Sequence, residues 1–132
     1  MVGFIESSTS VYAGNHLLLD FYGISNHGTK EEICAILIKA AEETGATVLF
    51  SHMHPFDGGG LSGVVVLAES HISIHIWEDE KFAAMDVFVC GECDPNKAIP
   101  ILTNFFKPDK IVESTSRRGV MKKIELTNYI ES

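Results

Sequence analysis

Side chains able to carry out nucleophilic, acid–base or metal chemistry gather between residues 51 and 93 of this 132-residue chain. They are His52, His54, Ser62, Glu69, Ser70, His71, Ser73, His75, Asp86, Cys90 and Cys93. Imidazoles exchange protons near neutral pH, hydroxyls and thiols act as nucleophiles, and histidine with cysteine binds zinc. This stretch therefore predicts a catalytic site, for which three kinds of chemistry compete.

A metal site is the first interpretation. His52 and His54 share one face of a strand, as do His71 and His75, and Cys90 could join them as a zinc ligand. However, no histidine pair lies on a helix with the i, i+4 spacing of strong zinc motifs, and histidines in strands are common without a metal. We therefore expect no metal at this site.

Thiol redox chemistry is the second interpretation. Cys90-Gly-Glu-Cys93 is a C-x-x-C sequence where a strand is expected to give way to a helix, and a helix N-terminus lowers the pKa of a thiol. A dithiol site of the thioredoxin type needs a preceding βαβ frame and an aromatic residue before the first cysteine, where this chain has Val89. The redox interpretation stays open but is less favoured.

The third interpretation rests on two longer segments. Residues 60–77 read GLSGVVVLAESHISIHIW, and residues 82–91 read FAAMDVFVCG. Together with GNHL at residues 14–17 and GAT at residues 45–47, they resemble the short prokaryotic S-adenosylmethionine decarboxylases over most of residues 14–100. The LAESHISIH sequence is the most specific part of this resemblance.

The resemblance implies a proenzyme that cuts itself. The peptide bond between Glu69 and Ser70 would be cleaved, so that the single domain 1–132 becomes a β chain of residues 1–69 and an α chain of residues 70–132. Ser70 would then carry a pyruvoyl group, the only cofactor that the resemblance implies.

Roles for further residues follow from the resemblance. The Ser70 hydroxyl would attack the Glu69 carbonyl to form an ester, His75 would remove the Ser70 α-proton as the processing base, and Ser62 would assist processing by hydrogen-bonding the oxyanion. In turnover the substrate amine would form a Schiff base with the pyruvoyl group, which accepts the electrons released with carbon dioxide. Cys90 would be the proton donor to the substrate carbon.

The resemblance also implies the substrate, S-adenosylmethionine, whose decarboxylated form supplies aminopropyl groups for spermidine and other polyamines. Phe56 and Trp77 match positions whose rings sandwich the adenine, and Asp79 matches a glutamate that contacts the ribose. The small-molecule substrate would bind at a homodimer of processed protomers, an (αβ)₂ assembly.

One departure from the family pattern supports a second substrate class. Where relatives usually read HTWPE, residues 75–79 read HIWED. An extra carboxylate at Asp57 or Glu78 would suit the cationic tail of L-ornithine or L-arginine, so decarboxylation of a basic amino acid is the alternative. A non-catalytic homologue is a further alternative, which the presence of Ser70, His75 and Cys90 disfavours.

The elements that must position these residues follow from periodicity and turn signals. Strands are expected at residues 16–22, 47–53, 63–69, 71–77, 84–90, 110–114 and 120–126. Helices are expected after Thr29, with Glu32 completing a capping box, and from Asp94 to about Phe106. Residues 1–13 read as a loose leader, and no turn signal separates the two runs that meet at Glu69.

These elements predict an α/β (α+β) fold, a two-layer sandwich of a mostly antiparallel sheet with helices on one face. The net charge of −8 argues against a nucleic-acid or anionic-membrane partner. We see no targeting segment, and the longest apolar stretch, at residues 63–68, is too short to span a bilayer. Three cysteines cannot all pair within one chain, so a cytoplasmic location with free thiols is expected.

Overall fold

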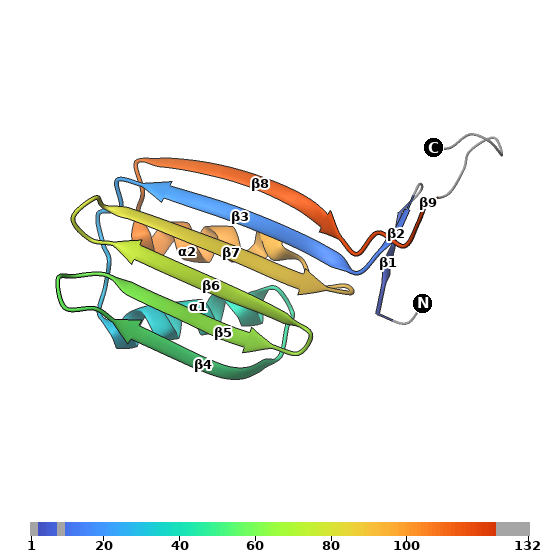
Figure 1. Ribbon diagram of the computed structural model, residues 1–132, viewed down its shortest axis with the longest axis horizontal. Coiled ribbons are helices and arrows are strands. Elements are labelled where there is room, and N and C mark those ends of the chain that lie inside the picture. Colours follow the sequence, from blue (N-terminus) through green and yellow to red (C-terminus); the bar gives the residue numbers. More distant parts are fainter. Residues whose placement is uncertain (1–2, 8–9, 124–132) are drawn as a thin grey trace.

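The computed structural model describes residues 3–7 and 10–123 and contains one large antiparallel sheet (Figure 1). Its six strands lie in the order β4-β5-β6-β7-β3-β8, and every neighbouring pair is antiparallel. They are β3 (Gly14–Tyr22), β4 (Val48–Pro55), β5 (Leu61–Leu67), β6 (Ser70–Trp77), β7 (Phe82–Cys90) and β8 (Lys110–Arg118). Strands β4 to β7 follow one another as hairpins, whereas β3 lies between β7 and β8.

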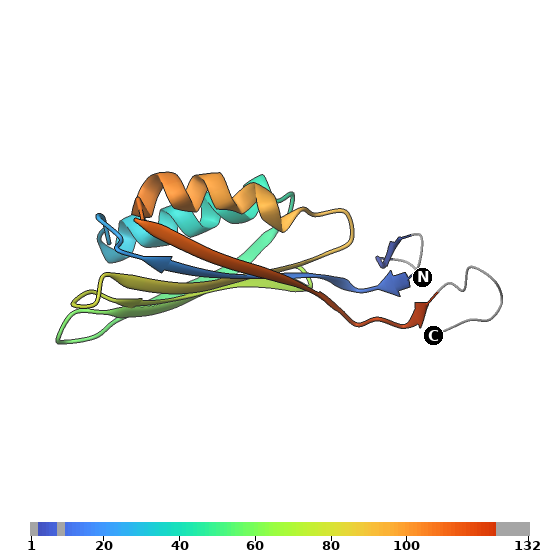
Figure 2. The ribbon, with the colours of Figure 1, turned by 90° about the horizontal axis from the view of Figure 1, so that it is seen from above.

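Both helices cover the same face of this sheet (Figure 2). They are α1 (Lys30–Glu43) and α2 (Ala98–Phe106), and a short 3₁₀ turn, η1 (Pro95–Lys97), precedes α2. The Thr29 side chain accepts a hydrogen bond from the Glu32 backbone, and the Glu32 side chain accepts one from the Thr29 backbone, which confirms the predicted capping box. The predicted two-layer sandwich is therefore confirmed.

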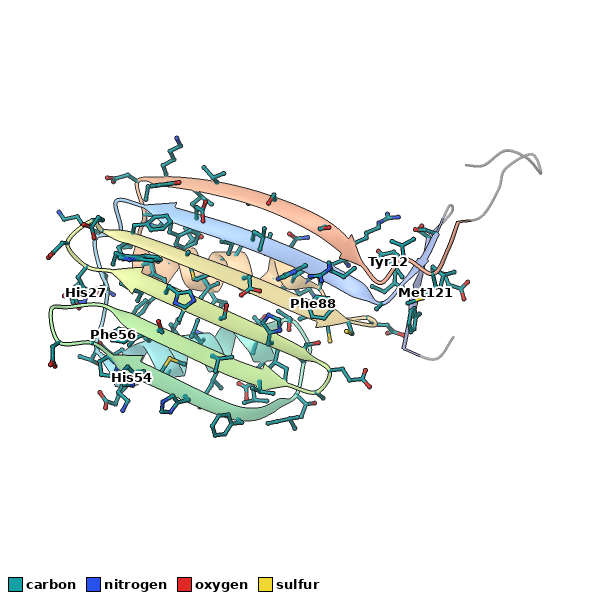
Figure 3. All side chains as sticks on the ribbon, in the orientation of Figure 1. Tyr12, His27, His54, Phe56, Phe88 and Met121 are labelled. Atoms are coloured by element: carbon teal, nitrogen blue, oxygen red, sulfur yellow. The ribbon has the colours of Figure 1, made fainter. Side chains whose placement is uncertain are left out.

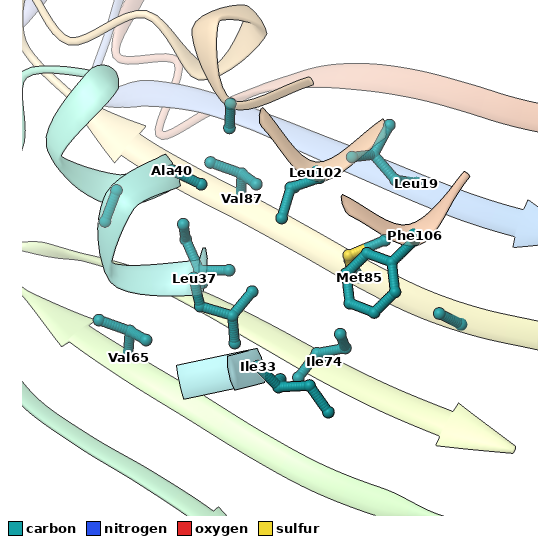
Figure 4. Close-up of a cluster of buried hydrophobic side chains, with 14 of the residues drawn as sticks. Leu19, Ile33, Leu37, Ala40, Val65, Ile74, Met85, Val87, Leu102 and Phe106 are labelled. Carbon is teal, nitrogen blue, oxygen red and sulfur yellow. The ribbon is translucent and has the colours of Figure 1, made fainter. Parts of the chain in front are cut away.

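The hydrophobic core fills the space between the helices and the sheet (Figure 4). Alternate residues of each strand supply it, since successive side chains point to opposite faces. In β6 these are Ile72, Ile74 and Ile76, which meet Leu37 of α1 and Leu102 of α2 in one buried cluster. The core therefore assigns the intervening residues of every strand to the other face.

That other face, which we call the open face, has no helix over it (Figure 2). Large apolar side chains are nevertheless exposed there; strand alternation and register assign to it Leu18, Tyr22, Phe50, Val66, Trp77 and Val112. An exposed apolar surface of this extent is typical of an interaction surface.

One junction that the sequence left open is a turn, and one local prediction was wrong. The runs that meet at Glu69 form a tight hairpin, in which Leu67 pairs with Ser70 and the turn consists of Ala68 and Glu69. The predicted leader is also ordered in part: β1 (Ile5–Glu6) and β2 (Ser10–Tyr12) form a small sheet with β9 (Lys122–Lys123), and Tyr12 is buried. Backbone pairing overrides the weak local signals in both places.

This small sheet projects beyond the end of the large one (Figure 1). Residues 124–126 of the strand predicted at 120–126 lie outside the described residues. In the part of the chain that the structure describes, neither helix has the length and apolar character needed to cross a membrane.

Candidate active site

The predicted site residues fall into two groups at opposite ends of strands β5, β6 and β7. Glu69, Ser70 and Cys90 lie where β6 begins and β7 ends, which we call the Ser70 end. Ser62 and His75 lie toward the other end of these strands, which we call the Trp77 end. Figure 3 shows Phe56 at the Trp77 end and Phe88 near the opposite end of the sheet.

At the Ser70 end, the backbone of Glu69 is in a conformation that residues other than glycine rarely adopt. Its φ is 63°, in the left-handed region that glycine usually occupies, because the turn between β5 and β6 has only two residues. A non-glycine residue held there costs about 1–3 kcal/mol. The peptide bond that follows Glu69 is therefore attached to a strained residue.

Cys90 contacts both sides of that peptide bond. Its thiol donates a hydrogen bond to the Glu69 carbonyl oxygen at 3.0 Å, and its backbone N–H donates one to the Ser70 hydroxyl oxygen at 3.2 Å. β3 also lies close to β7 at this point. Gly14 pairs with Cys90, and a Cβ on Gly14 would lie only 2.3 Å from the Val89 carbonyl oxygen. The arrangement can stabilise negative charge on the Glu69 oxygen while holding the hydroxyl nearby.

At the Trp77 end, Ser62 and His75 form a side-chain pair. They are direct cross-strand partners in β5 and β6, and Ser62 Oγ lies 2.8 Å from His75 Nδ1. The same two residues line a hollow of about 160 Å³ together with Phe56 and Trp77. Four of the predicted site residues are thus brought together, with two aromatic rings beside an imidazole.

Asp79 does not line that hollow. It lies in a separate hollow of about 350 Å³ with Glu78 and His27, and a Glu78 carboxylate oxygen is 3.6 Å from His27 Nδ1. Asp57 is exposed in the turn between β4 and β5. Neither of the extra carboxylates that would suit a basic amino acid therefore lies among the residues lining the hollow beside Trp77.

One chain does not bring the two ends together. Ser70 and His75 are five positions apart in β6, so they are about 16 Å apart at about 3.3 Å per residue. A His75 that acts on Ser70 must therefore come from elsewhere than the same chain.

Between the two ends lies a polar network on the open face that the sequence did not predict as a unit. The Asp86 carboxylate accepts hydrogen bonds from Ser73, from His16 Nε2 at 2.5 Å and from His71 Nε2 at 2.9 Å. Partial burial opposes the charged form, but the hydrogen bonds from Ser73, His16 and His71 outweigh it and lower the pKa of Asp86. Asp86 is therefore a carboxylate at neutral pH.

The two histidines of this network differ in their second ring nitrogen. Arg118 lies 2.8 Å from His16 Nδ1, and because an arginine only donates, His16 accepts there and carries its proton on Nε2. His71 Nδ1 has no hydrogen-bond partner among the described residues, and the His71 side chain is 40% exposed.

His16, His71 and Asp86 have the ligand types of a metal site, with donor atoms within 4.8 Å of one another. A metal on His16 Nε2 would need the proton on Nδ1, where Arg118 donates instead. The arrangement therefore fits a hydrogen-bonded network better than a metal site. The register could have revealed it, since His16 and His71 both lie opposite Phe88, but sequence alone does not give that register.

The second cysteine of the C-x-x-C sequence is poorly suited to redox chemistry. Burial, followed by the proximity of Cys90 and Glu92, raises the pKa of the Cys93 thiol. Cys90 and Cys93 are both free thiols. Their arrangement favours separate roles over a dithiol pair.

Comparison with known proteins identifies relatives. A family model described as S-adenosylmethionine decarboxylase matches residues 15–119. The S-adenosylmethionine decarboxylase proenzyme of Methanococcus maripaludis strain C5 is 40% identical over 116 residues, covering 86% of this chain and 95% of that protein. The proenzyme of the same name from Sulfurihydrogenibium sp. is 38% identical over 111 residues, covering 82% of this chain and 84% of that protein.

A solved structure agrees with these relatives. The adenosylmethionine decarboxylase from Aquifex aeolicus VF5 superposes with a TM-score of 0.73 at 32% sequence identity. The match covers 84% of this chain and 94% of that one, so the similarity extends over most of both chains rather than a single motif.

The Asp86 network predicts a pH-dependent contribution to stability. Because the folded-state pKa of Asp86 is lowered, its stabilisation is present above the unfolded pKa of about 3.9 and is lost as the pH falls through the folded pKa. We expect Asp86→Asn to lower the free energy of unfolding by about 1–3 kcal/mol at neutral pH and by less at about pH 3. Urea unfolding at both pH values measures this difference.

The control for this prediction is Asp20→Asn. Asp20 lies on the same face but makes no hydrogen bond through its carboxylate among the described residues, so its replacement should change stability little. A destabilisation by Asp86→Asn that persists unchanged at low pH would contradict the assigned charge of the carboxylate.

Replacing Cys93 separates the redox interpretation from the others. If Cys90 acts alone, Cys93→Ser should retain activity within about threefold, since removing the raised-pKa thiol leaves the contacts of Cys90 in place. Activity is measured as carbon dioxide release. A complete loss in Cys93→Ser, together with a disulfide to Cys90 in the wild type, would support a dithiol mechanism instead.

Proposed function

Because this chain belongs to the S-adenosylmethionine decarboxylase family, we propose that it is a self-processing, pyruvoyl-dependent decarboxylase of S-adenosylmethionine. The observation that carries this proposal is the contact of Cys90 with both Glu69 and Ser70, the two residues whose peptide bond would be cut. The product would serve as the aminopropyl donor for spermidine and other polyamines.

The contacts at the Ser70 end support self-cleavage in chemical terms. Attack of Ser70 Oγ on the Glu69 carbonyl carbon converts the amide into an ester and places negative charge on the Glu69 oxygen in passing. The Cys90 thiol already donates to that oxygen, so the stabilising group is in place before the charge develops. Removal of the Ser70 α-proton then expels the Glu69 carboxylate, separates residues 1–69 from 70–132 and leaves a dehydroalanine at position 70. Its imine tautomer is hydrolysed by water to the pyruvoyl group, and the nitrogen leaves as ammonia.

The surroundings of Ser70 fit a pyruvoyl group at the new chain start. β6 stays paired with β7 on one side and β5 on the other, so residue 70 keeps its place after the cut. The group would be held next to Cys90, and its carbonyl supplies the sink for electrons that decarboxylation releases. Cys90 is then close enough to deliver a proton to the substrate carbon.

The missing base is supplied by a second copy of the chain. His75 and Ser62 lie about 16 Å from Ser70 within one chain, at the Trp77 end of the sheet. Two sheets packed open face to open face, with a twofold axis across the strands, place the Ser70 end of one copy over the Trp77 end of the other. Each active site then combines Ser70 and Cys90 with the partner's His75.

The open face has the character that such a dimer requires. Leu18, Phe50 and Val66 are exposed on it, although no helix covers them. Packing against a second sheet would bury this surface as a sheet-on-sheet core. A hollow of about 290 Å³ near its middle, lined in part by His75 and Asp86, would become enclosed.

The aromatic hollow at the Trp77 end supports S-adenosylmethionine over a basic amino acid. Phe56 and Trp77 offer faces to an adenine ring and to a sulfonium cation. The carboxylate that a basic amino acid would need is not there, since Glu78 lies next to His27 in another hollow. The relatives named above carry the name of the same activity. Asp79 lies outside this hollow within one chain. Its contact with the ribose therefore stays a prediction from the family resemblance.

Co-production of two inactive chains tests both the cut and the dimer. A chain with Ser70→Ala has no nucleophile, and a chain with His75→Gln has no base, so each alone should stay intact near 14.5 kDa. Produced together, the His75→Gln chain should be cut, because the partner's His75 reaches its Ser70. A denaturing gel reads the result, and cleavage of His75→Gln alone would contradict the shared site.

Carbon dioxide release identifies the substrate. Purified, processed protein is supplied separately with carboxyl-labelled S-adenosylmethionine, L-ornithine and L-arginine. We expect S-adenosylmethionine to exceed the other two by at least about 100-fold in kcat/KM, because aromatic stacking and the sulfonium contact are lost without the nucleoside. A preference for ornithine or arginine would overturn the assignment, and Trp77→Ala should raise KM for S-adenosylmethionine in particular.

A further inference from the structure

His71 occupies a position on the open face that the proposed mechanism does not use. Asp86, Phe88 and Cys90 take successive open-face positions of β7, and His71 pairs directly with the middle one, Phe88. Asp86 and Cys90 are therefore its two diagonal neighbours, each about 7–8 Å away between Cα atoms, which an imidazole can reach.

His71 forms a hydrogen bond with one of these two neighbours, Asp86. Its Nε2 lies 2.9 Å from an Asp86 carboxylate oxygen, so this nitrogen carries the proton and Asp86 orients the ring. Nδ1 makes no hydrogen bond to any described residue, so this nitrogen is available to take up a proton from a water molecule and to release it. A carboxylate that orients an imidazole next to a thiol is the arrangement that activates a cysteine in other contexts.

The other histidine of the network cannot do the same. His16 Nδ1 accepts a hydrogen bond from Arg118 at 2.8 Å, and its Nε2 is 2.5 Å from Asp86, so both ring nitrogens are engaged. Among the described groups that face Cys90 from β3, β6 and β8, His71 is thus the imidazole with a nitrogen available for proton transfer.

We propose that His71, oriented by Asp86, returns a proton to Cys90 after each turnover. This proposal rests on the proposed function, in which Cys90 donates its proton to the substrate carbon and becomes a thiolate. His71 carrying protons on both nitrogens then gives the Nδ1 proton to the sulfur, and a water molecule restores it. Decarboxylation consumes one proton per substrate, and this route delivers that proton from solvent.

His71→Gln tests the proposal while preserving the network. The glutamine amide can donate to Asp86 in place of Nε2, but it cannot accept and release a proton at the other position. With processed enzyme, we expect kcat to fall by at least about 10-fold, with KM for S-adenosylmethionine unchanged within twofold. The matched control is His52→Gln, because His52 lies on the open face of β4, and this change should leave kcat and KM unchanged.

Chemical rescue distinguishes proton transfer from a structural role. His71→Ala leaves space for a small base, so added imidazole should restore a substantial part of kcat. Asp86→Asn should also lower kcat but should not respond to imidazole, because its own His71 is still present. A His71→Ala enzyme that loses activity without rescue, or a His71→Gln enzyme with wild-type kcat, overturns the proposal.

A readout that does not need the processed enzyme covers the case in which these variants are not cut. In a Ser70→Ala background every chain stays intact, and Cys90 alkylation by iodoacetamide is followed by peptide mass mapping. Adding His71→Gln should slow Cys90 alkylation at pH 7 by about 10-fold, whereas His52→Gln should not, and equal rates would overturn the proposal. Failure of the wild type to cleave or to release carbon dioxide defeats the proposed function instead, and leaves this comparison intact.

Discussion

The antiparallel register between β6 and β7 determines where each reactive group can act. Because His71 pairs with Phe88, the turn before β6 falls beside the last residue of β7, and Cys90 reaches both the Glu69 carbonyl and the Ser70 hydroxyl. A slip of one residue would turn Cys90 to the helix-covered face and separate it from the bond. The same register fixes His75 at the far end of β6. The backbone hydrogen bonds that bring Cys90 to Ser70 therefore also keep His75 of the same chain away from them.

This separation links catalysis to the uncovered face of the sheet. A sheet with helices on one side must leave its other side to solvent or to a partner, and here that side carries exposed Leu18, Phe50 and Val66. If a second copy covers this face, the apolar burial that stabilises the dimer also delivers the missing histidine. Assembly and self-cleavage then become one event, which protects a lone chain from being cut before its partner is present.

The parts of the fold that sequence could predict are those set by local chemistry. Thr29 and Glu32 cap α1 through contacts three residues apart, and the alternation of Ile72, Ile74 and Ile76 marks a buried strand face without reference to other strands. The hairpin at Glu69 was missed because Ala68 and Glu69 are not turn residues, and only pairing on both sides holds Glu69 at positive φ. The Asp86 network was missed for a similar reason: His16 is 70 residues from Asp86, and only the register of β3 with β7 makes them neighbours.

The Asp86 network also explains how a charged group can lie on a face that a partner would cover. Burying an unpaired carboxylate costs several kcal/mol, and that cost would oppose dimer formation directly. Here Ser73, His16 and His71 satisfy Asp86 within one chain, and Arg118 places a positive charge on the far side of His16. The carboxylate therefore has its hydrogen-bond partners before assembly, with the Arg118 charge one side chain away, so covering the open face leaves no unpaired carboxylate. Among the described residues, His71 Nδ1 has no hydrogen-bond partner, and the register makes Cys90 a diagonal neighbour of His71, where an exchangeable proton is useful and a fully paired residue would not be.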